Sequence, residues 1–145
     1  MNRTIEANFF PDVVEPIKEK ACILIIDDNQ DLTHSAKLAL EKTGRYVVCE
    51  ENDASKAHQT AQGVKPDLIL LDIAMPGTDG GEVAARIQSN PELQRIPIVF
   101  LTAPVTNAEG NSGLRIQGHP FLAKPVSLPK LIDGIEKNLP ARAAF

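Results

Sequence analysis

Short, continuously apolar segments recur along this chain, and each is followed by a stretch with helical periodicity. The segments CILIID (residues 22–27), LILLDI (68–73) and PIVFLT (97–102) are apolar almost to their last positions. Strands with one face in water alternate polar and apolar residues, whereas continuously apolar strands are typical of parallel sheets that are covered on both faces. The pattern therefore predicts a parallel sheet with helices on both sides.

Five strand–helix pairs are expected along the chain, and repeated alternation of this kind implies right-handed crossovers. The predicted fold is an α/β, flavodoxin-like, doubly wound, five-stranded parallel sheet of order 2-1-3-4-5 with five helices. The fourth helix should be short or irregular, because each of its glycines costs roughly 1 kcal/mol relative to alanine. The strands are expected at residues 22–27, 46–50, 68–73, 97–102 and 121–123, and the helices at residues 31–43, 54–62, 81–88, 107–117 and 128–138.

A chain of 145 residues is long enough for one compact domain and short for two. We expect an N-terminal arm (residues 1–20), one domain (21–140) and a C-terminal tail (141–145). The arm is partly apolar and lies outside the strand–helix alternation. It is interpreted as a loose or surface-packed extension, and the sequence leaves a role in self-association, as in a homodimer, open.

Charge and hydropathy exclude several classes of protein. With 15 basic and 19 acidic residues the net charge is -4, which disfavours nucleic-acid binding, because that depends on neutralising phosphates. No apolar run approaches the ~20 residues needed to span a bilayer, and residues 1–20 lack the pattern of a secretion signal. Two cysteines without a CxxC motif make a poor zinc site. A cytoplasmic protein without nucleic-acid or membrane partners is expected.

Chemically active side chains stand where the predicted strands end. The acidic pair Asp27–Asp28 ends the first strand, Asp72 the third, Thr102 the fourth, and Lys124 directly follows the fifth. Ligands of such sheets bind beyond the carboxyl ends of the strands. In the expected order the first and third strands are neighbours, so we predict that these residues converge on one rim.

The cluster has a defined chemistry. Three adjacent carboxylates resist joint ionisation, and Mg²⁺ (or Mn²⁺) resolves this conflict because it binds carboxylates together with phosphate oxygens. Asp72 is the candidate nucleophile, since aspartate can form an aspartyl-phosphate. Lys124 would neutralise the phosphoryl group and Thr102 would donate a hydrogen bond to it. Each residue alone has a structural interpretation, such as a helix cap or a turn; the joint pattern favours a phosphoryl-transfer site.

The sequence resembles the receiver domains of two-component response regulators, of the chemotaxis-regulator type, over residues 21–139. The resemblance rests on four segments taken together. These are ILIIDDN (residues 23–29), DLILLDIAMPGTDG (67–80), IPIVFLTA (96–103) and FLAKP (121–125).

The resemblance implies a role for each matching residue. Asp72 is the expected phosphoacceptor. Mg²⁺ would be bound by the side chains of Asp28 and Asp72 and by the backbone carbonyl of Ala74, while Asp27 would act through a metal-bound water.

The remaining matches concern the phosphoryl group and the switch. Lys124 and Thr102 would contact the phosphoryl group, and the small side chain of Ala103 leaves access to it open. Thr102 and Phe121 are the expected switch residues. The Lys124–Pro125 peptide bond is expected to be cis.

The resemblance also implies partners and a mode of regulation. A sensor histidine kinase or a histidine phosphotransfer protein would donate the phosphoryl group. A downstream protein would bind the face formed by the fourth helix, the fifth strand and the fifth helix. The domain would catalyse only its own phosphorylation and autodephosphorylation. Autodephosphorylation should be slow, because the side chains of Ala74 and Pro104 cannot hydrogen-bond an attacking water.

Three other interpretations of the strand-end residues fit the sequence less well. A phosphatase of the haloacid dehalogenase type needs a second acid two residues after its nucleophile, where this chain has Ala74. A receiver-like module that never takes phosphate normally lacks an acidic or lysine position that is present here. A dinucleotide-binding domain needs a glycine-rich turn after the first strand, where this chain has acidic residues. The sequence does not decide between a stand-alone regulator and a piece of a longer chain.

Overall fold

The fold is that of a computed structural model, which describes residues 20–103 and 117–140. Several of the predicted features lie outside the described residues. These are residues 1–19 of the arm, Pro104, residues 107–116 of the predicted fourth helix, and the C-terminal tail. The described part of the chain contains no helix with the length and apolar character needed to cross a membrane.

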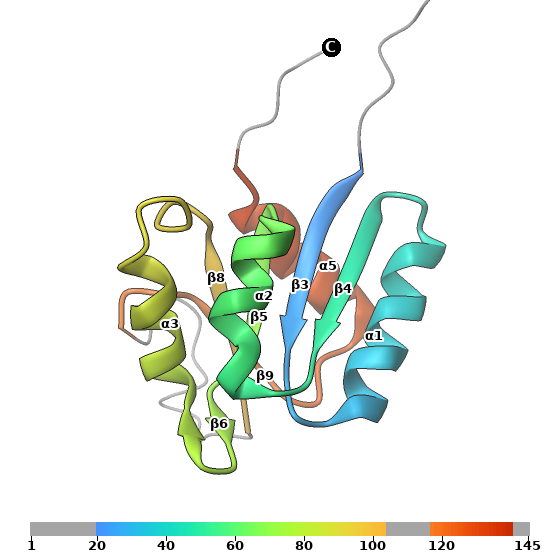
Figure 1. The fold of residues 1–145 in the computed structure, drawn as a ribbon. Coiled ribbons are helices and arrows are strands. Elements are labelled where there is room, and N and C mark those ends of the chain that lie inside the picture. The colour runs from blue at the N-terminus through green and yellow to red at the C-terminus, as the bar shows by residue number, and fades with distance from the viewer. Residues whose placement is uncertain (1–19, 104–116, 141–145) are drawn as a thin grey trace, which may run out of the picture.

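A five-stranded parallel sheet forms the centre of the described region (Figure 1). Its strand order, β4-β3-β5-β8-β9, is the predicted order 2-1-3-4-5 counted along these five strands, so that prediction is confirmed. Every neighbouring pair is parallel, which places all carboxyl ends at one edge of the sheet. The strands are β3 (Ala21–Ile26), β4 (Tyr46–Glu51), β5 (Leu68–Asp72), β8 (Ile98–Thr102) and β9 (Phe121–Ala123).

Helices cover both faces of the sheet, as the apolar strands require (Figure 1). The cluster on one face includes side chains from α1 and α5, and the cluster on the other includes side chains from α2 and α3. Every residue of β5 and β8 is buried, which confirms the interpretation of continuously apolar segments as central strands. Four of the five predicted helices fall in the described residues: α1 (Gln30–Lys42), α2 (Ala57–Val64), α3 (Gly80–Gln88) and α5 (Leu128–Asn138).

Two boundaries show how local chemistry sets the ends of helices. Gly44 follows α1 with a φ of 80°, in the left-handed region that glycine adopts without a steric penalty. The second helix, predicted at residues 54–62, begins as the 3₁₀ turn η1 (Ala54–Lys56) and continues as α2 to Val64, two residues beyond its predicted end. Lys65 follows it in the left-handed conformation and donates its N–H to the carbonyl of Ala61, in which form many helices end.

Gly80 closes the loop after β5 so tightly that no side chain fits. Its N–H donates to the carbonyl of Ile73 at 2.9 Å. A Cβ added to Gly80 would lie 2.5 Å from the carbonyl oxygen of Asp72 and 2.5 Å from the Cα of Ile73. Both are backbone atoms of the chain leaving the central strand, so they cannot move aside as the end of a side chain would.

Replacing Gly80 with alanine is therefore expected to lower the free energy of unfolding by about 2 kcal/mol, in the range observed for overpacked interiors. The matched control is Gly63→Ala in α2, because an added Cβ would meet nothing within 4 Å there. That change should stabilise the helix by up to ~1 kcal/mol. Urea unfolding of both variants measures the difference, and equal stabilities would contradict the steric argument.

Candidate functional site

The predicted rim forms at the carboxyl ends of the strands (Figure 1). Asp27 and Asp28 follow β3 and Asp72 ends β5, and these strands are neighbours in the sheet. Thr102 ends β8 and Lys124 follows β9, which pairs with β8. The parallel topology thus brings together residues that are separated by up to 97 positions in the chain.

The three aspartates form a compact cluster. One carboxylate oxygen from each of Asp27, Asp28 and Asp72 lies within 4.8 Å of the other two. Asp27 is fully buried and Asp72 is 3% exposed, whereas Asp28 is exposed to solvent. Two of the three charges are therefore shielded from water, which makes their mutual repulsion stronger than it would be at a surface.

Lys124 is the cation that faces this cluster. Its Nζ donates a hydrogen bond to Asp27 Oδ2 at 2.7 Å and lies 3.4 Å from Asp72 Oδ1. Burial disfavours the charged form of Lys124, but the hydrogen bond and charge of Asp27, together with the charge of Asp72, outweigh it and raise the pKa of Lys124. The lysine therefore stays protonated and bridges the two buried acids.

The pKa of the Asp72 carboxyl reflects its burial and its charged neighbours. Burial raises the pKa of Asp72, and the nearby charge of Asp27 raises it further. The N–H of Ala74, which donates to Asp72 Oδ1 at 3.2 Å, and the charge of Lys124 act in the opposite direction without cancelling the increase. Within residues 20–103 and 117–140, one lysine faces three carboxylates, so these groups together carry an excess of negative charge that a cation would relieve.

Thr102 brings an unsatisfied hydroxyl to the same rim. Its side chain is buried, and Oγ1 has no hydrogen-bond partner, alone among the buried side-chain nitrogen and oxygen atoms of residues 20–103 and 117–140. Leaving a buried polar group unpaired costs about 1–3 kcal/mol. A hydroxyl held in this state at the edge of a charged cluster is poised to bond an oxygen that enters the site.

The other predicted residues surround these groups. Ala74 lies in the short strand β6 (Ala74–Met75), which pairs with β7 (Thr78–Asp79) in a hairpin beside the rim. Ala103 is exposed just beyond Thr102, and Phe121 is half-buried at the start of β9. The peptide bond between Lys124 and Pro125 is cis.

Sequence reasoning missed the residues that hold the acidic loop in place. The Asn29 N–H donates to Asp27 Oδ1 at 3.0 Å, and the Asn52 side chain donates to the carbonyl of Asp27 at 2.7 Å. Asn52 also donates to the hydroxyl of Thr33 in α1 at 3.0 Å. The sequence holds one indication for Asn52. It directly follows β4, so it stands at the carboxyl end of a strand, as the other residues of the site do.

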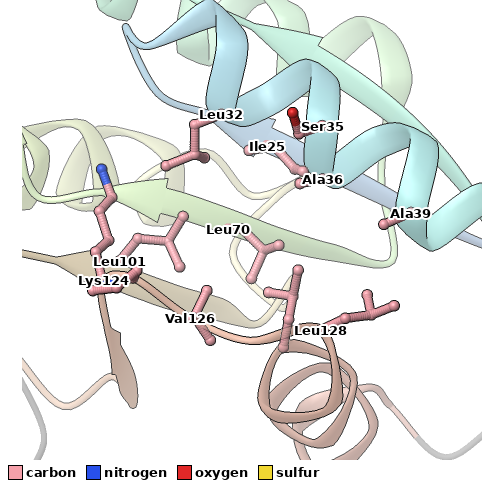
Figure 2. Close-up of a pocket in the computed structure, with 12 residues that line it drawn as sticks. Ile25, Leu32, Ser35, Ala36, Ala39, Leu70, Leu101, Lys124, Val126 and Leu128 are labelled. Carbon is pink, nitrogen blue, oxygen red and sulfur yellow. The ribbon is translucent and has the colours of Figure 1, made fainter.

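An apolar groove of about 320 Å³ adjoins the site. Side chains of α1 face those of the sheet and of the connection from β9 to α5 across it, and the side chain of Lys124 lies at one end (Figure 2). The groove is therefore continuous with the charged cluster through a shared lysine. Its lining residues are Ile25, Leu32, Ser35, Ala36, Ala39, Leu70, Leu101, Lys124, Pro125, Val126, Leu128 and Leu131.

The donor set fits a hard divalent cation. The converging carboxylate oxygens are the ligands that Mg²⁺ takes in proteins, and Mg²⁺ commonly keeps some coordination positions for water and phosphate oxygens. No cysteine or histidine takes part in the cluster, so softer metals gain no preferred ligand.

Comparison with known proteins places this arrangement in a family. The family model of the response regulator receiver domain matches residues 23–136. The chain is 36% identical over 117 residues to the phosphate regulon transcriptional regulatory protein PhoB of Pseudomonas aeruginosa, covering 81% of this chain and 51% of that protein. It is 36% identical over 118 residues to the nisin biosynthesis regulatory protein NisR of Lactococcus lactis, covering 81% and 49%. The chain thus spans about half the length of these relatives.

Solved structures agree with this placement. A response regulator from Desulfuromonas acetoxidans superposes with a TM-score of 0.69 at 26% identity, over 81% of this chain and 94% of that one. The chemotaxis protein CheY4 of Vibrio cholerae shares the fold, with a TM-score of 0.72 at 24% identity over 83% of this chain and 100% of that one. The family match, the relatives and the acidic rim agree, and the chain belongs to the response regulator receiver domains of two-component signalling.

Proposed function

We propose that this domain accepts one phosphoryl group on Asp72 from a phosphohistidine, in a reaction that depends on a bound Mg²⁺ or Mn²⁺. The observation that carries the proposal is the rim itself: three converging carboxylates, one bridging lysine and one unpartnered hydroxyl. Phosphoryl transfer needs charge neutralisation and in-line positioning above all. These residues provide both.

The contacts of Asp27 support the division of roles among the acids. Its Oδ1 accepts the Asn29 N–H and its Oδ2 accepts the Lys124 ammonium, which favours an indirect role through water. We therefore assign the metal to the side chains of Asp28 and Asp72 and to the carbonyl of Ala74. When bound, the cation would neutralise charge on the acids and on the phosphoryl oxygens.

The transfer step uses the described side chains in a defined way. An Asp72 carboxylate oxygen attacks phosphorus and forms the O–P bond. The N–P bond of the donor breaks, and its electron pair returns to the histidine ring. Lys124 has its ammonium next to Asp72 and would pair with one phosphoryl oxygen. The hydroxyl of Thr102 would donate to another and so gain the partner that it lacks.

A hydrogen bond between the Thr102 hydroxyl and the phosphoryl group would allow the domain to change conformation. A new hydrogen bond from Thr102 moves the end of β8, and Phe121 lies on the adjacent strand, where it packs against the α2–α3 cluster. We propose that Phe121 turns inward in response and that the face including β9 and α5 then binds a downstream protein. This is a two-state element biased by a local change of charge.

The phosphodonor is proposed to dock on the groove beside Lys124. A donor must bring its phosphohistidine to Asp72, so it covers the surface that borders the charged rim. The groove is apolar, half-open and continuous with that rim through Lys124 (Figure 2). A histidine kinase or phosphotransfer domain with an apolar helix face matches these features.

Leu128→Asp tests this docking surface. Leu128 lines the groove at the start of α5 and is 37% exposed, and an acidic residue at a helix N-terminus is tolerated by the helix dipole. Transfer from a phosphorylated histidine phosphotransfer domain should slow about tenfold, as for loss of an interface contact worth ~1.4 kcal/mol. Phosphorylation by acetyl phosphate should not change.

Leu38→Asp is the matched control, since Leu38 is also on the surface, 56% exposed, in α1 but outside the groove. Its transfer rate should equal that of the parent. If the Leu128 variant also reacts at the parent rate with the protein donor, the groove is not the docking surface.

A turnover enzyme is the competing class. A phosphatase of the haloacid dehalogenase type would need a general acid two residues after Asp72, where this chain has Ala74, which contacts the Asp72 carboxylate through its backbone N–H. We therefore expect a single covalent modification and no sustained hydrolysis of p-nitrophenyl phosphate. We also propose that the domain is a cytoplasmic signalling module. Its own surface is proposed not to bind nucleic acid, because the chain carries a net charge of -4.

The function is tested with a small-molecule donor. Incubation with acetyl phosphate and Mg²⁺, followed by intact mass measurement, should add the mass of one phosphoryl group to the protein. With EDTA in place of Mg²⁺ the adduct should be absent. A protein that remains unmodified at saturating donor and Mg²⁺ would refute the proposal.

A further inference from the structure

Asn52 and Thr33 form a polar contact behind the acidic loop, away from the residues already assigned to the reaction. Asn52 follows β4, and its side-chain nitrogen lies 2.7 Å from the carbonyl oxygen of Asp27 and 3.0 Å from Thr33 Oγ1. An amide NH₂ carries two hydrogens. Asn52 can therefore serve both acceptors at once, one in the loop that carries the acids and one in α1.

Thr33 extends this hydrogen-bond network from Asn52 to the carboxylate of Glu50. It is fully buried in α1, and its hydroxyl donates to Glu50 Oε1 at 2.7 Å. The single hydrogen of this hydroxyl has a second acceptor, the carbonyl of Gln30 at 3.1 Å, and Glu50 Oε1 is the nearer of the two. The hydroxyl accepts from Asn52, whose NH₂ group can only donate. Glu50 Oε2 lies 3.5 Å from Nδ1 of His34. The network therefore connects α1, the end of β4 and the end of β3.

The end of this network holds the peptide group between Asp27 and Asp28. The N–H of Asp27 donates to the carbonyl of Glu51 at 3.1 Å, and its carbonyl accepts from Asn52. Both backbone groups of Asp27 are thus fixed to the β4 side, while its carboxylate is fixed by Asn29 and Lys124. The peptide plane after Asp27 decides where the next residue, Asp28, projects.

We propose that Asn52 and Thr33 are positioning residues for the divalent-cation site. This inference rests on the proposed function, because it concerns the metal that the reaction uses. By fixing the Asp27–Asp28 peptide, they hold the carboxylate of Asp28 close to that of Asp72 against mutual repulsion. A preorganised set of ligands binds a cation more tightly than one that must be assembled on binding, and losing such an outer partner typically weakens metal affinity about 10–100-fold.

The experiment measures Mg²⁺ affinity by isothermal titration for the parent and four variants of the full chain. Thr33→Val keeps the volume and removes the hydroxyl, and Asn52→Ala removes the amide. Both should weaken Mg²⁺ binding at least about tenfold. Thr33→Ser keeps the hydroxyl and should stay within about twofold of the parent, since the same hydrogen bonds remain available.

Thr43→Val is the matched control. Thr43 also lies at an end of α1, and its hydroxyl donates to the carbonyl of Leu40 at 2.7 Å, remote in sequence from the acidic loop. This variant should lose stability without losing affinity for Mg²⁺. The free energy of unfolding of every variant is measured without metal, so that loss of structure is separated from loss of affinity.

A second measurement separates positioning from catalysis. The rate of phosphorylation by acetyl phosphate should fall in Thr33→Val and Asn52→Ala at low Mg²⁺ and return to the parent rate when Mg²⁺ is saturating. Parent-like Mg²⁺ affinity in either folded variant would overturn the inference. If Thr33→Val does not fold, the decision rests on Asn52→Ala, which changes a loop residue. A parent that binds no Mg²⁺ would instead refute the proposed function.

Discussion

Asp72→Asn is expected to abolish phosphorylation: with acetyl phosphate and Mg²⁺ the variant should show no adduct by intact mass, whereas the parent gains one phosphoryl group. The amide removes both the nucleophilic oxygen anion and a proposed metal ligand, and the shape of the side chain is retained. Asp133→Asn is the control, because Asp133 lies exposed on α5 and, within residues 20–103 and 117–140, forms an ion pair only with the nearby Lys137. That variant should be modified like the parent. An adduct in Asp72→Asn would assign the phosphoryl group to another residue.

The same substitution should also stabilise the metal-free domain at neutral pH. Burial, together with the charge of Asp27, raises the pKa of Asp72 above its unfolded value near 3.8. A carboxyl whose pKa is raised on folding contributes stability below the unfolded pKa, and this contribution is lost as the pH rises through the folded pKa. The advantage of Asp72→Asn over the parent should therefore be absent near pH 3.8 and grow toward pH 7.

Urea unfolding at several pH values in EDTA measures this difference. A variant that is less stable than the parent at neutral pH would mean that the contact of Lys124 with Asp72 outweighs the burial of the carboxylate. The loss of phosphorylation and the gain of stability have separate causes, so each can fail without the other.

Lys124→Met is expected to cost about 3 kcal/mol of stability in the absence of metal, in the range found when one partner of a buried ion pair is removed. The methionine fills a similar volume, but Asp27 Oδ2 loses its hydrogen bond and two buried carboxylates lose the ammonium between them. Lys137→Met is the control, since that side chain is 72% exposed in an i,i+4 pair with Asp133. Exposed ion pairs contribute only about 0–1 kcal/mol to the free energy of unfolding.

Mg²⁺ should reverse part of the loss in Lys124→Met, because the cation supplies the missing positive charge near the same acids. The double variant with Asp27→Asn should be more stable than Lys124→Met alone, since it removes one of the uncompensated charges. Thermal unfolding with and without Mg²⁺ tests both expectations. If Lys124→Met matches Lys137→Met in EDTA, the lysine does not offset the repulsion between the acids.

The sheet and the rim were predictable because they depend on short-range sequence patterns. Continuous apolar runs identified β5 and β8 as central strands, and all of their residues are buried. Once the strands are parallel, their carboxyl ends must share an edge, so residues at strand ends meet whatever their separation in the chain. That geometry predicted the convergence of Asp28, Asp72 and Lys124 without any coordinates.

Other features depend on contacts that no local pattern encodes. His119 precedes a proline, and in a loop it would be expected at the surface. It is instead 9% exposed, with its ring edge-on to Phe100 at 5.5 Å. Asn52 was missed because the predicted strand ended at residue 50, two residues short of it. Errors of this size at strand boundaries are common and here concealed a residue of the site.

The amino-acid sequence alone was enough to indicate which polar residues follow the strands and at which edge of the sheet they stand, because the period of apolar residues and the position of strand ends are local properties. How those residues are held depends on the packed fold. The bridge of Lys124 to Asp27, the unpartnered hydroxyl of Thr102 and the network from Asn52 through Thr33 each depend on side chains from separate elements. Hydrogen bonds need their partners within a few tenths of an ångström, and that precision exists only once the helices have packed on the sheet.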